Sequence, residues 1–225
     1  MLVELRDVRK VYSRGLREVA ALAGLSLEIE EGESVTIMGP SGSGKSTLLS
    51  ILGCLDLPSS GSYMLGGIEV SGLDDSALSR VRNQRIGFVF QSFHLIAQLT
   101  IAENVETPLL YRGLPEAESR RRALRSLERV GLLPRAEHRP AELSGGEAQR
   151  AAVARALVTE PHILLADEPT GNLDTATGEE VAGLLEELHR DGRTVILVTH
   201  NEALGRRARR IVHIRDGRVE HEART

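Results

Sequence analysis

Cysteine, aromatic residues and long apolar runs are all scarce in this chain. Cys54 is the only cysteine, so no intrachain disulfide can form, and its apolar surroundings between Leu48 and Leu57 predict a buried core thiol. No stretch approaches the roughly 18 apolar residues of a membrane-spanning helix. Charges interrupt the opening MLVELRDVRK, where a secretory signal would be continuously apolar. We therefore expect a chain that needs a partner for any role at a membrane.

A surplus of basic charge is also absent. The 28 basic and 32 acidic side chains leave a formal net charge of -4, whereas proteins that bind nucleic acid need clustered Lys and Arg to neutralise phosphates. Nucleic acid is therefore not the expected partner. With 225 residues, 41% of them hydrophobic, the chain can bury one sizeable core and a smaller lobe, but not several independent domains.

Two kinds of strand pattern are present. Residues 2–12 and 22–38 alternate between apolar and polar positions, with a turn at EEGE, which predicts a small antiparallel sheet. The segments 86–90, 163–166 and 194–199 are short, almost wholly apolar and separated by helical patterns. Strands that are buried on both faces of a parallel sheet have this character, so the sequence predicts an α/β fold.

The remaining patterns predict a helical insertion and a final hairpin. Between residues 92 and 161 no comparably apolar strand occurs, and the Arg-rich segment SRRRALRSLERVGL has helical periodicity, so we expect an inserted helical lobe. The catalytic core would then comprise residues 1–91 and 162–225 of a single domain. Near the end, Asp216-Gly217 separates two alternating segments in IVHIRDGRV, which is a hairpin signal.

A glycine-rich segment carries the strongest functional signal. Gly39 to Ser46, GPSGSGKS, fits the pattern G-x-x-x-x-G-K-[ST], in which backbone N–H groups surround phosphates. It follows an apolar strand and opens a helix over residues 44–55. Lys45 would reach the β- and γ-phosphates, and Ser46 the magnesium ion. Lysine occurs only at positions 10 and 45 of this Arg-rich chain, and the compact ammonium suits a phosphate nest.

Polar side chains follow each of the three apolar segments. Asp167 and Glu168 come after ILLA, Gln91 after IGFVF, and His200 after TVILVT. Open α/β sheets bind ligands at the carboxyl edge of their strands, so we expect these side chains to lie at that edge. Asp167 suits the magnesium ion, directly or through water, and Glu168 suits the attacking water. Gln91 and His200 would lie at the same edge, where a sensor of the γ-phosphate is expected.

A second anion-binding segment is predicted at LSGGE, residues 143–147. Ser144 at a helix start, followed by two glycines, offers a side-chain cap and open backbone donors. A capping turn without a ligand is the alternative. Because one nucleotide needs one phosphate cradle, the second cradle is explained if it serves the nucleotide of a partner subunit. This predicts a two-fold dimer with two composite sites.

In their order along the chain and in their sequences, these motifs resemble those of the ATP-binding-cassette (ABC) family. The resemblance covers essentially the whole chain. GPSGSGKS is similar to its Walker A, ILLADE to its Walker B, LSGGE to its signature and GNLD, residues 171–174, to its D-loop. Gln91 resembles the Q-loop glutamine, His200 the switch histidine and Tyr12 the A-loop aromatic that stacks on adenine. The resemblance implies a P-loop NTPase fold with a mainly parallel RecA-like core sheet flanked by helices, an N-terminal antiparallel β subdomain and an inserted helical signature subdomain.

The resemblance also implies a role for each residue in binding and hydrolysing ATP. Catalysis would depend on Glu168, His200, Gln91 and Lys45, with Asp174 coupling the two sites of an ATP-closed homodimer. Mg2+ would be held by Ser46, Gln91 and Asp167. One protomer would bind ATP through Tyr12, Gly39, Ser41, Gly42, Ser43, Gly44, Lys45, Ser46, Thr47, Gln91 and His200, and the opposite protomer through Ser144, Gly145, Gly146 and Glu147.

Within the family, the sequence of residues 38–61, 88–111 and 166–174 is similar to the sequences of the MacB, LolD and FtsE branch. This resemblance implies an ATPase at the cytoplasmic face of the inner membrane that drives a separate permease for export or lipoprotein release. Through the permease, the ATPase would also connect to periplasmic or accessory partners. Gln91 and residues 93–99 would line the groove for a coupling helix of the permease. The commonest signature has Gln where this chain has Glu147, and the extra carboxylate near a γ-phosphate would weaken binding.

Other functions stay open at this point. An FtsE-like ATPase of cell division would share every motif. A non-transport cassette ATPase acting on nucleic acid would typically insert long coiled coils or fuse two cassettes, and this chain shows neither. A small-molecule kinase with the same P-loop would leave LSGGE and His200 without a role.

Overall fold

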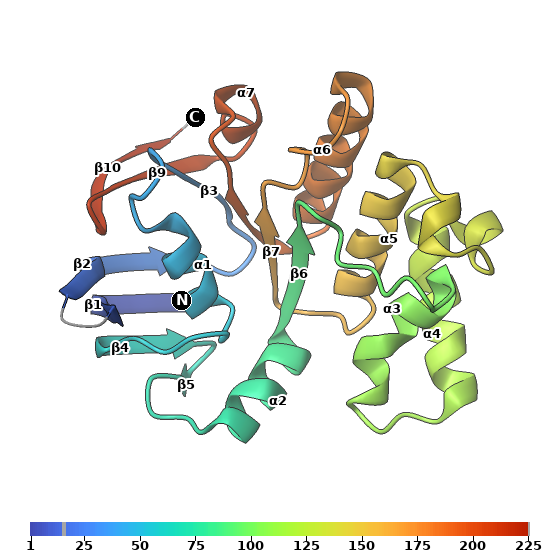
Figure 1. Cartoon of the computed structure of the whole chain (residues 1–225), viewed down its shortest axis with the longest axis horizontal. Helices are drawn as coiled ribbons and strands as arrows, with labels where there is room; N and C mark the ends of the chain where they lie inside the picture. Colours follow the sequence, from blue (N-terminus) through green and yellow to red (C-terminus); the bar gives the residue numbers. More distant parts are fainter. Residues whose placement is uncertain (15–16, 225) are drawn as a thin grey trace. The chain divides into compact units, whose positions relative to one another are not determined.

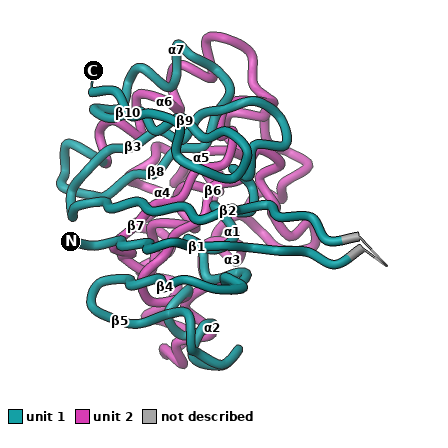
Figure 2. Tube along the Cα trace, turned by 90° about the vertical axis from the view of Figure 1, so that its left-hand side faces the viewer, with its two compact units in different colours: residues 1–82, 189–225 teal, residues 83–188 magenta. Residues whose placement is uncertain are grey.

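The computed structural model describes residues 1–14 and 17–224, which divide into two compact units (Figure 2). The first unit contains residues 1–82 and the segment from His189 onward, and the second contains Asn83–Leu188. Figure 1 shows the helices and strands along the chain. Among the helices of the described ranges, none has both the length and the apolar character that a membrane crossing requires.

The first unit contains the antiparallel sheet expected near the start of the chain. Its strand order is β2-β1-β4-β5. The strands are β1 (Val3–Arg14), β2 (Arg17–Ile29), β4 (Ser60–Leu65) and β5 (Ile68–Glu69). β2 starts earlier than the expected residue 22, because Val19 pairs with Tyr12 of β1. Both side chains are substantially exposed, so this end of the β1–β2 pair is held by backbone hydrogen bonds rather than by burial. The sequence therefore has no apolar pattern there from which the strand could be predicted.

A second group of strands in the first unit carries the parallel pairing. Its order is β10-β9-β3-β8, with β3 parallel to both β8 and β9, and β9 antiparallel to β10. The strands are β3 (Ser34–Met38), β8 (Thr194–Val198), β9 (Arg210–Arg215) and β10 (Arg218–Arg224). Every residue of β8 is buried, which confirms that its apolar run marks a core strand. The hairpin expected around Asp216-Gly217 joins β9 and β10.

Short helices follow these parallel strands. The helix α1 (Lys45–Leu52) begins directly after the glycine loop that follows β3, and α7 (Glu202–Gly205) follows β8. α1 buries Leu48, Leu49, Ile51 and Leu52, and its chain then turns so that Cys54 is buried. Burial raises the pKa of the Cys54 thiol to about 11.

The second unit combines two parallel strands with helices. β6 (Ile86–Phe90) pairs in parallel with β7 (Ile163–Asp167). In the described stretch between them no strand occurs, and the elements are α3 (Ile101–Leu110), α4 (Glu116–Arg129), α5 (Gly145–Leu157) and two 3-10 turns (Leu133–Arg135 and Pro140–Glu142). The helix α6 (Thr175–Arg190) follows β7, and α2 (Asp75–Arg85), most of which belongs to the first unit, precedes β6 in the chain. Gly87 lets α5 approach β6, because a Cβ there would lie 2.5 Å from the Ala156 carbonyl oxygen.

Buried polar side chains hold the segment after β6. Asn104 of α3 is fully buried, and its amide donates to the carbonyls of Ile96 and Thr100 and accepts from the Ile96 N–H. Arg155 of α5 donates to the carbonyls of Phe93 and His94. Because the side chains replace missing backbone partners, residues 93–100 are fixed without regular secondary structure.

Candidate nucleotide-binding and catalytic site

The glycine loop between β3 and α1 has the backbone of a phosphate cradle. Gly39 cannot be replaced by a larger residue without movement, since a Cβ there would lie 2.1 Å from the carbonyl oxygen of Ile214. Gly44 is the N-cap of α1 with φ 104°, and its Cβ would lie 2.5 Å from the Ala21 carbonyl oxygen. The first N–H groups of α1 have no acceptor within the helix and carry the positive end of its dipole. The loop therefore presents donors to an anion.

Two side chains of the loop fit an anion as well. The Lys45 ammonium donates hydrogen bonds to the loop carbonyls of Gly39 and Pro40 at 2.7 and 2.8 Å. Ser43 is 3% exposed, and its hydroxyl has no hydrogen-bond partner among the described residues. A buried hydroxyl without a partner costs free energy unless a ligand supplies one. Phosphate oxygens would satisfy both the serine and the ammonium.

Two further expected residues lie in the first unit. Tyr12 of β1 is 39% exposed, its hydroxyl donates to Asp56 at 2.9 Å, and the Lys10 ammonium lies 5.1 Å from its ring centroid. Partial burial, followed by the hydrogen bond to Asp56, raises the pKa of Tyr12. His200 follows β8 and Gly39 follows β3, and because these parallel strands are neighbours, both residues come at the same carboxyl edge.

In the second unit, the paired carboxylates stand at the end of β7. Asp167 and Glu168 are half-buried. Glu168 adopts a left-handed φ of 44°, and its carbonyl accepts from the Gly171 N–H at 3.0 Å. Such a conformation costs about 1 kcal/mol or more outside glycine and is typical of functional sites. The buried side chain of Gln149, in α5, donates to the Pro169 carbonyl at 2.6 Å and so ties α5 to this turn.

Gln91 and the segment expected to form the D-loop, residues 171–174, contact each other in the same unit. The Gln91 side-chain amide donates to the Asn172 side-chain oxygen at 3.0 Å, and the Asn172 amide donates to the Gln91 carbonyl at 3.1 Å. Gly171 permits this approach, since a Cβ there would lie 2.7 Å from Gln91 Nε2. The pair fixes where Gln91 points relative to residues 171–174.

The signature segment caps α5 with a reciprocal pair of hydrogen bonds. The Ser144 hydroxyl accepts from the Glu147 N–H at 3.3 Å, while Glu147 Oε2 accepts from the Ser144 N–H at 2.9 Å and from its hydroxyl at 3.0 Å. Glu147 Oε1 accepts from Arg135 Nε at 2.9 Å. The Ser144 backbone, then Arg135 and the Ser144 hydroxyl, lower the pKa of Glu147 to about 2. The extra carboxylate is therefore turned back onto its own helix and partly offset by an arginine.

The signature glycines pack against the D-loop and α6. A Cβ on Gly146 would lie 2.1 Å from Thr177 Cγ2, and one on Gly145 would lie 3.3 Å from Leu173 Cδ2. Asp174 caps α6, because its carboxylate accepts from the Thr177 N–H at 3.1 Å and from the Thr177 hydroxyl at 2.7 Å. These bonds lower the pKa of Asp174. The second unit thus brings together the expected signature, D-loop, Q-loop and Walker B residues.

Replacing Glu147 by glutamine tests the reciprocal cap. At neutral pH we expect Glu147→Gln to be less stable than the wild type by about 0.5–1 kcal/mol, because a charged N-terminal partner is lost. The folded pKa lies below that of the unfolded chain, so this advantage is present above about pH 4.3 and is lost as the pH falls toward about 2. Urea unfolding at pH 7 and pH 3 measures both values. Glu128→Gln, at an exposed position of α4, is the control, and equal destabilisation of Glu147→Gln at both pH values would contradict the assignment.

Comparison with known proteins identifies the family. Residues 22–171 match the family model described as ABC transporter, and the chain belongs to this family of ATP-binding proteins. It is 55% identical to an uncharacterized ABC transporter ATP-binding protein of Thermotoga maritima, covering 97% of this chain and 94% of that protein. It is also 50% identical to the macrolide export ATP-binding/permease protein MacB of Hyphomonas neptunium, over 97% of this chain but only 34% of that longer protein.

A solved structure agrees with this identification. The cassette MJ0796, in a dimeric post-hydrolysis state bound to ADP and Pi, is 47% identical, with a TM-score of 0.91 over 99% of this chain and 98% of that chain. The fold class expected from the sequence is therefore confirmed, and the chain is an ABC ATPase, the ATP-binding component of a transporter.

Several residues that shape the site were not anticipated from the sequence. Gln149 and Arg155 lie on the helix that follows the signature, and their partners are carbonyls far along the chain, which no local pattern reveals. The Ser144–Glu147 cap, by contrast, has the S-x-x-E spacing of a capping box and could have been predicted from it.

Proposed function

We propose that this ATPase closes as a head-to-tail homodimer around two Mg-ATP molecules and drives a membrane permease of the exporter or lipoprotein-release type. The observation that carries the proposal is that two helices of one chain, α1 and α5, begin at glycine-containing segments of the kind that bind anions. The dimeric state of the related cassette MJ0796 supports it. Each site would use the P-loop of one protomer and the signature of the other.

In each proposed site, different residues of this chain bind the phosphates, the adenine and the attacking water. Lys45, Ser43 and the N–H groups at the start of α1 hold the β- and γ-phosphates, and Tyr12 stacks on adenine. Glu168 orients the attacking water and accepts its proton, while His200 contacts the γ-phosphate.

The metal would be shared between protein and nucleotide. In the ranges that the structure describes, no three His, Cys, Asp or Glu side chains cluster as metal ligands. Mg2+, when bound, neutralises phosphate charge, and it keeps few protein ligands when phosphates are present. Ser46, Gln91 and Asp167 would supply the oxygen ligands that it prefers.

The proposed membrane partner is a permease that docks on the helical lobe over residues 92–161. The segment that follows Gln91 is held by Asn104 and Arg155, yet Ile96 is 42% exposed, which suits a groove for a coupling helix. MacB and the pyoverdine export ATP-binding/permease protein PvdT of Pseudomonas aeruginosa, 52% identical to this chain, favour export over a cell-division role. The chain would then lie at the cytoplasmic face of the inner membrane through its permease.

Complementation between two inactive variants tests the composite site. Lys45→Ala should inactivate the P-loop and Ser144→Arg the signature, so each homodimer is inactive. A mixed dimer keeps one intact site, and a 1:1 mixture should regain about a quarter of the wild-type sites. ATP hydrolysis of the mixture measures the recovery. If two folded variants regain nothing, the P-loop and the signature do not combine across protomers.

A further inference from the structure

The β9–β10 hairpin contacts the phosphate-binding loop within the first unit. Its two-residue turn has left-handed φ values of 49° at Asp216 and 72° at Gly217. The Gly217 N–H donates to the Ser43 carbonyl at 2.9 Å, and the Gly217 carbonyl accepts from the Ala23 N–H at 2.9 Å. A single glycine therefore links the hairpin, the glycine loop and β2.

The approach of these segments is too close for any side chain at position 217. A Cβ there would lie 2.7 Å from the Ala21 carbonyl oxygen, 2.8 Å from Leu22 Cα and 2.9 Å from the Ala23 nitrogen. These are backbone atoms, which cannot turn away as a side chain would. A Cβ at Gly44 of the loop would lie 2.5 Å from the same Ala21 carbonyl oxygen. Two glycines thus allow the backbones to meet.

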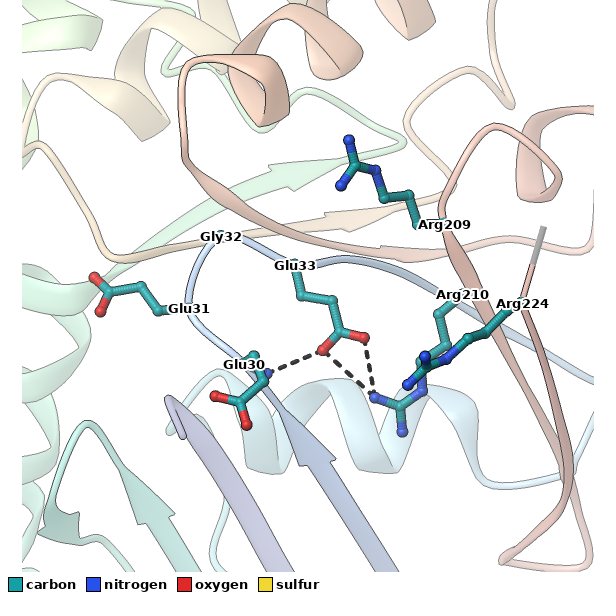
Figure 3. A pocket seen from close by; sticks show the side chains of 7 residues that line it. All are labelled: Glu30, Glu31, Gly32, Glu33, Arg209, Arg210 and Arg224. Carbon is teal, nitrogen blue, oxygen red and sulfur yellow. Dashed lines mark hydrogen bonds and ion pairs between the residues drawn. The ribbon is translucent and has the colours of Figure 1, made fainter.

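The other end of the hairpin is firmly attached. Arg210 of β9 donates to the Glu28 carbonyl at 2.8 Å, contacts Glu33 at 3.1 Å and pairs with Glu222 of β10 at 2.8 Å. Figure 3 shows the Glu33–Arg210 pair at the edge of a pocket of about 520 Å3. The Arg210 side chain is only 14% exposed, so the pair is well shielded from water. β9 is also paired in parallel with β3, whose end leads into the loop.

This attachment determines how one peptide group of the loop is oriented. In a trans peptide the C=O and the following N–H point in opposite directions. The Ser43 carbonyl is held on the hairpin side by Gly217, so the Gly44 N–H points to the opposite side. We propose that Gly217 is a positioning residue for nucleotide binding, which turns the Gly44 N–H toward the phosphates. The proposal rests on the proposed nucleotide site at residues 39–46.

Gly217→Ala tests this role against a matched control. Gly67, in the turn between β4 and β5 of the same unit, has φ 80° with no atom within 4 Å of a Cβ, so Gly67→Ala adds backbone strain without a contact. Affinity for Mg-ADP, without Pi and at a protein concentration at which light scattering shows a monomer, is measured apart from any effect of dimer closure. A misdirected donor to a charged phosphate should weaken binding about 10- to 100-fold in Gly217→Ala, with Gly67→Ala within about two-fold of the wild type.

The NMR signal of the Gly44 amide gives a readout that lost stability alone would not change. On adding Mg-ADP, this signal should shift strongly in the wild type and in Gly67→Ala but not in Gly217→Ala. If Gly217→Ala binds and shifts as Gly67→Ala does, the positioning role is wrong.

Two further variants separate other outcomes. If Gly217→Ala does not fold, Arg210→Met loosens the hairpin from its far end, and the proposal requires a several-fold loss of Mg-ADP affinity. An affinity within two-fold of the wild type would overturn it. If the wild type does not bind Mg-ADP, or Lys45→Ala binds equally well, the nucleotide site itself is misassigned, which is a separate failure.

Discussion

Glu168→Gln should bind ATP normally, hydrolyse it about 100- to 10,000-fold more slowly, and form a stable dimer only when ATP is present. The carboxylate of Glu168 stands at the end of β7 on a strained backbone, and an amide in its place cannot accept a proton from water. With hydrolysis blocked, the closed dimer should accumulate. Light scattering after size exclusion would show the molar mass doubling on addition of ATP.

Glu160→Gln provides the control for this variant. Glu160 is exposed, lies in the same unit and also has a left-handed φ, of 52°, but it precedes β7 rather than following it. The Glu160→Gln variant should hydrolyse ATP at the rate of the wild type. A monomer of Glu168→Gln with ATP demonstrably bound would mean that closure needs the permease, or that the α5 start is a cap and not a second phosphate site.

Lys45→Ala should weaken ATP binding about 100-fold or more, because in the proposed site the ammonium would be the charged donor nearest the phosphates. In the structure its nitrogen is already held over the loop by the carbonyls of Gly39 and Pro40, so little ordering remains to be done on binding. Lys45→Arg should recover only part of the affinity, since a planar guanidinium is too large for the same nest. Calorimetric titration with Mg-ATP measures all three proteins.

A second cation of the first unit serves as the control. Arg80 is exposed on α2, and Arg80→Ala removes one positive charge without touching the loop. Its ATP affinity should stay within about two-fold of the wild type, because exposed charges are screened by salt. Equal losses for Lys45→Ala and Arg80→Ala would reduce the role of Lys45 to general electrostatic attraction.

The sequence predicted the features that depend on neighbouring residues. Apolar runs such as 194–198 identify buried strands, and the glycine spacing of 39–46 identifies the loop, because burial and φ preferences act locally. The contact of Gly217 with Ser43 could not be predicted, since it joins backbone groups far apart in the chain and leaves only a hairpin glycine as its trace. The same holds for the carbonyl partners of Gln149 and Arg155.

The burial of Cys54 makes the protein convenient for site-specific labelling. Only the thiolate reacts with common thiol reagents, and a thiol that is 1% exposed with a pKa of about 11 presents almost none at neutral pH. A cysteine introduced on the surface would therefore carry a fluorophore or a spin label with little background from the native thiol. Distances between two such labels could follow the opening and closing of a dimer during turnover.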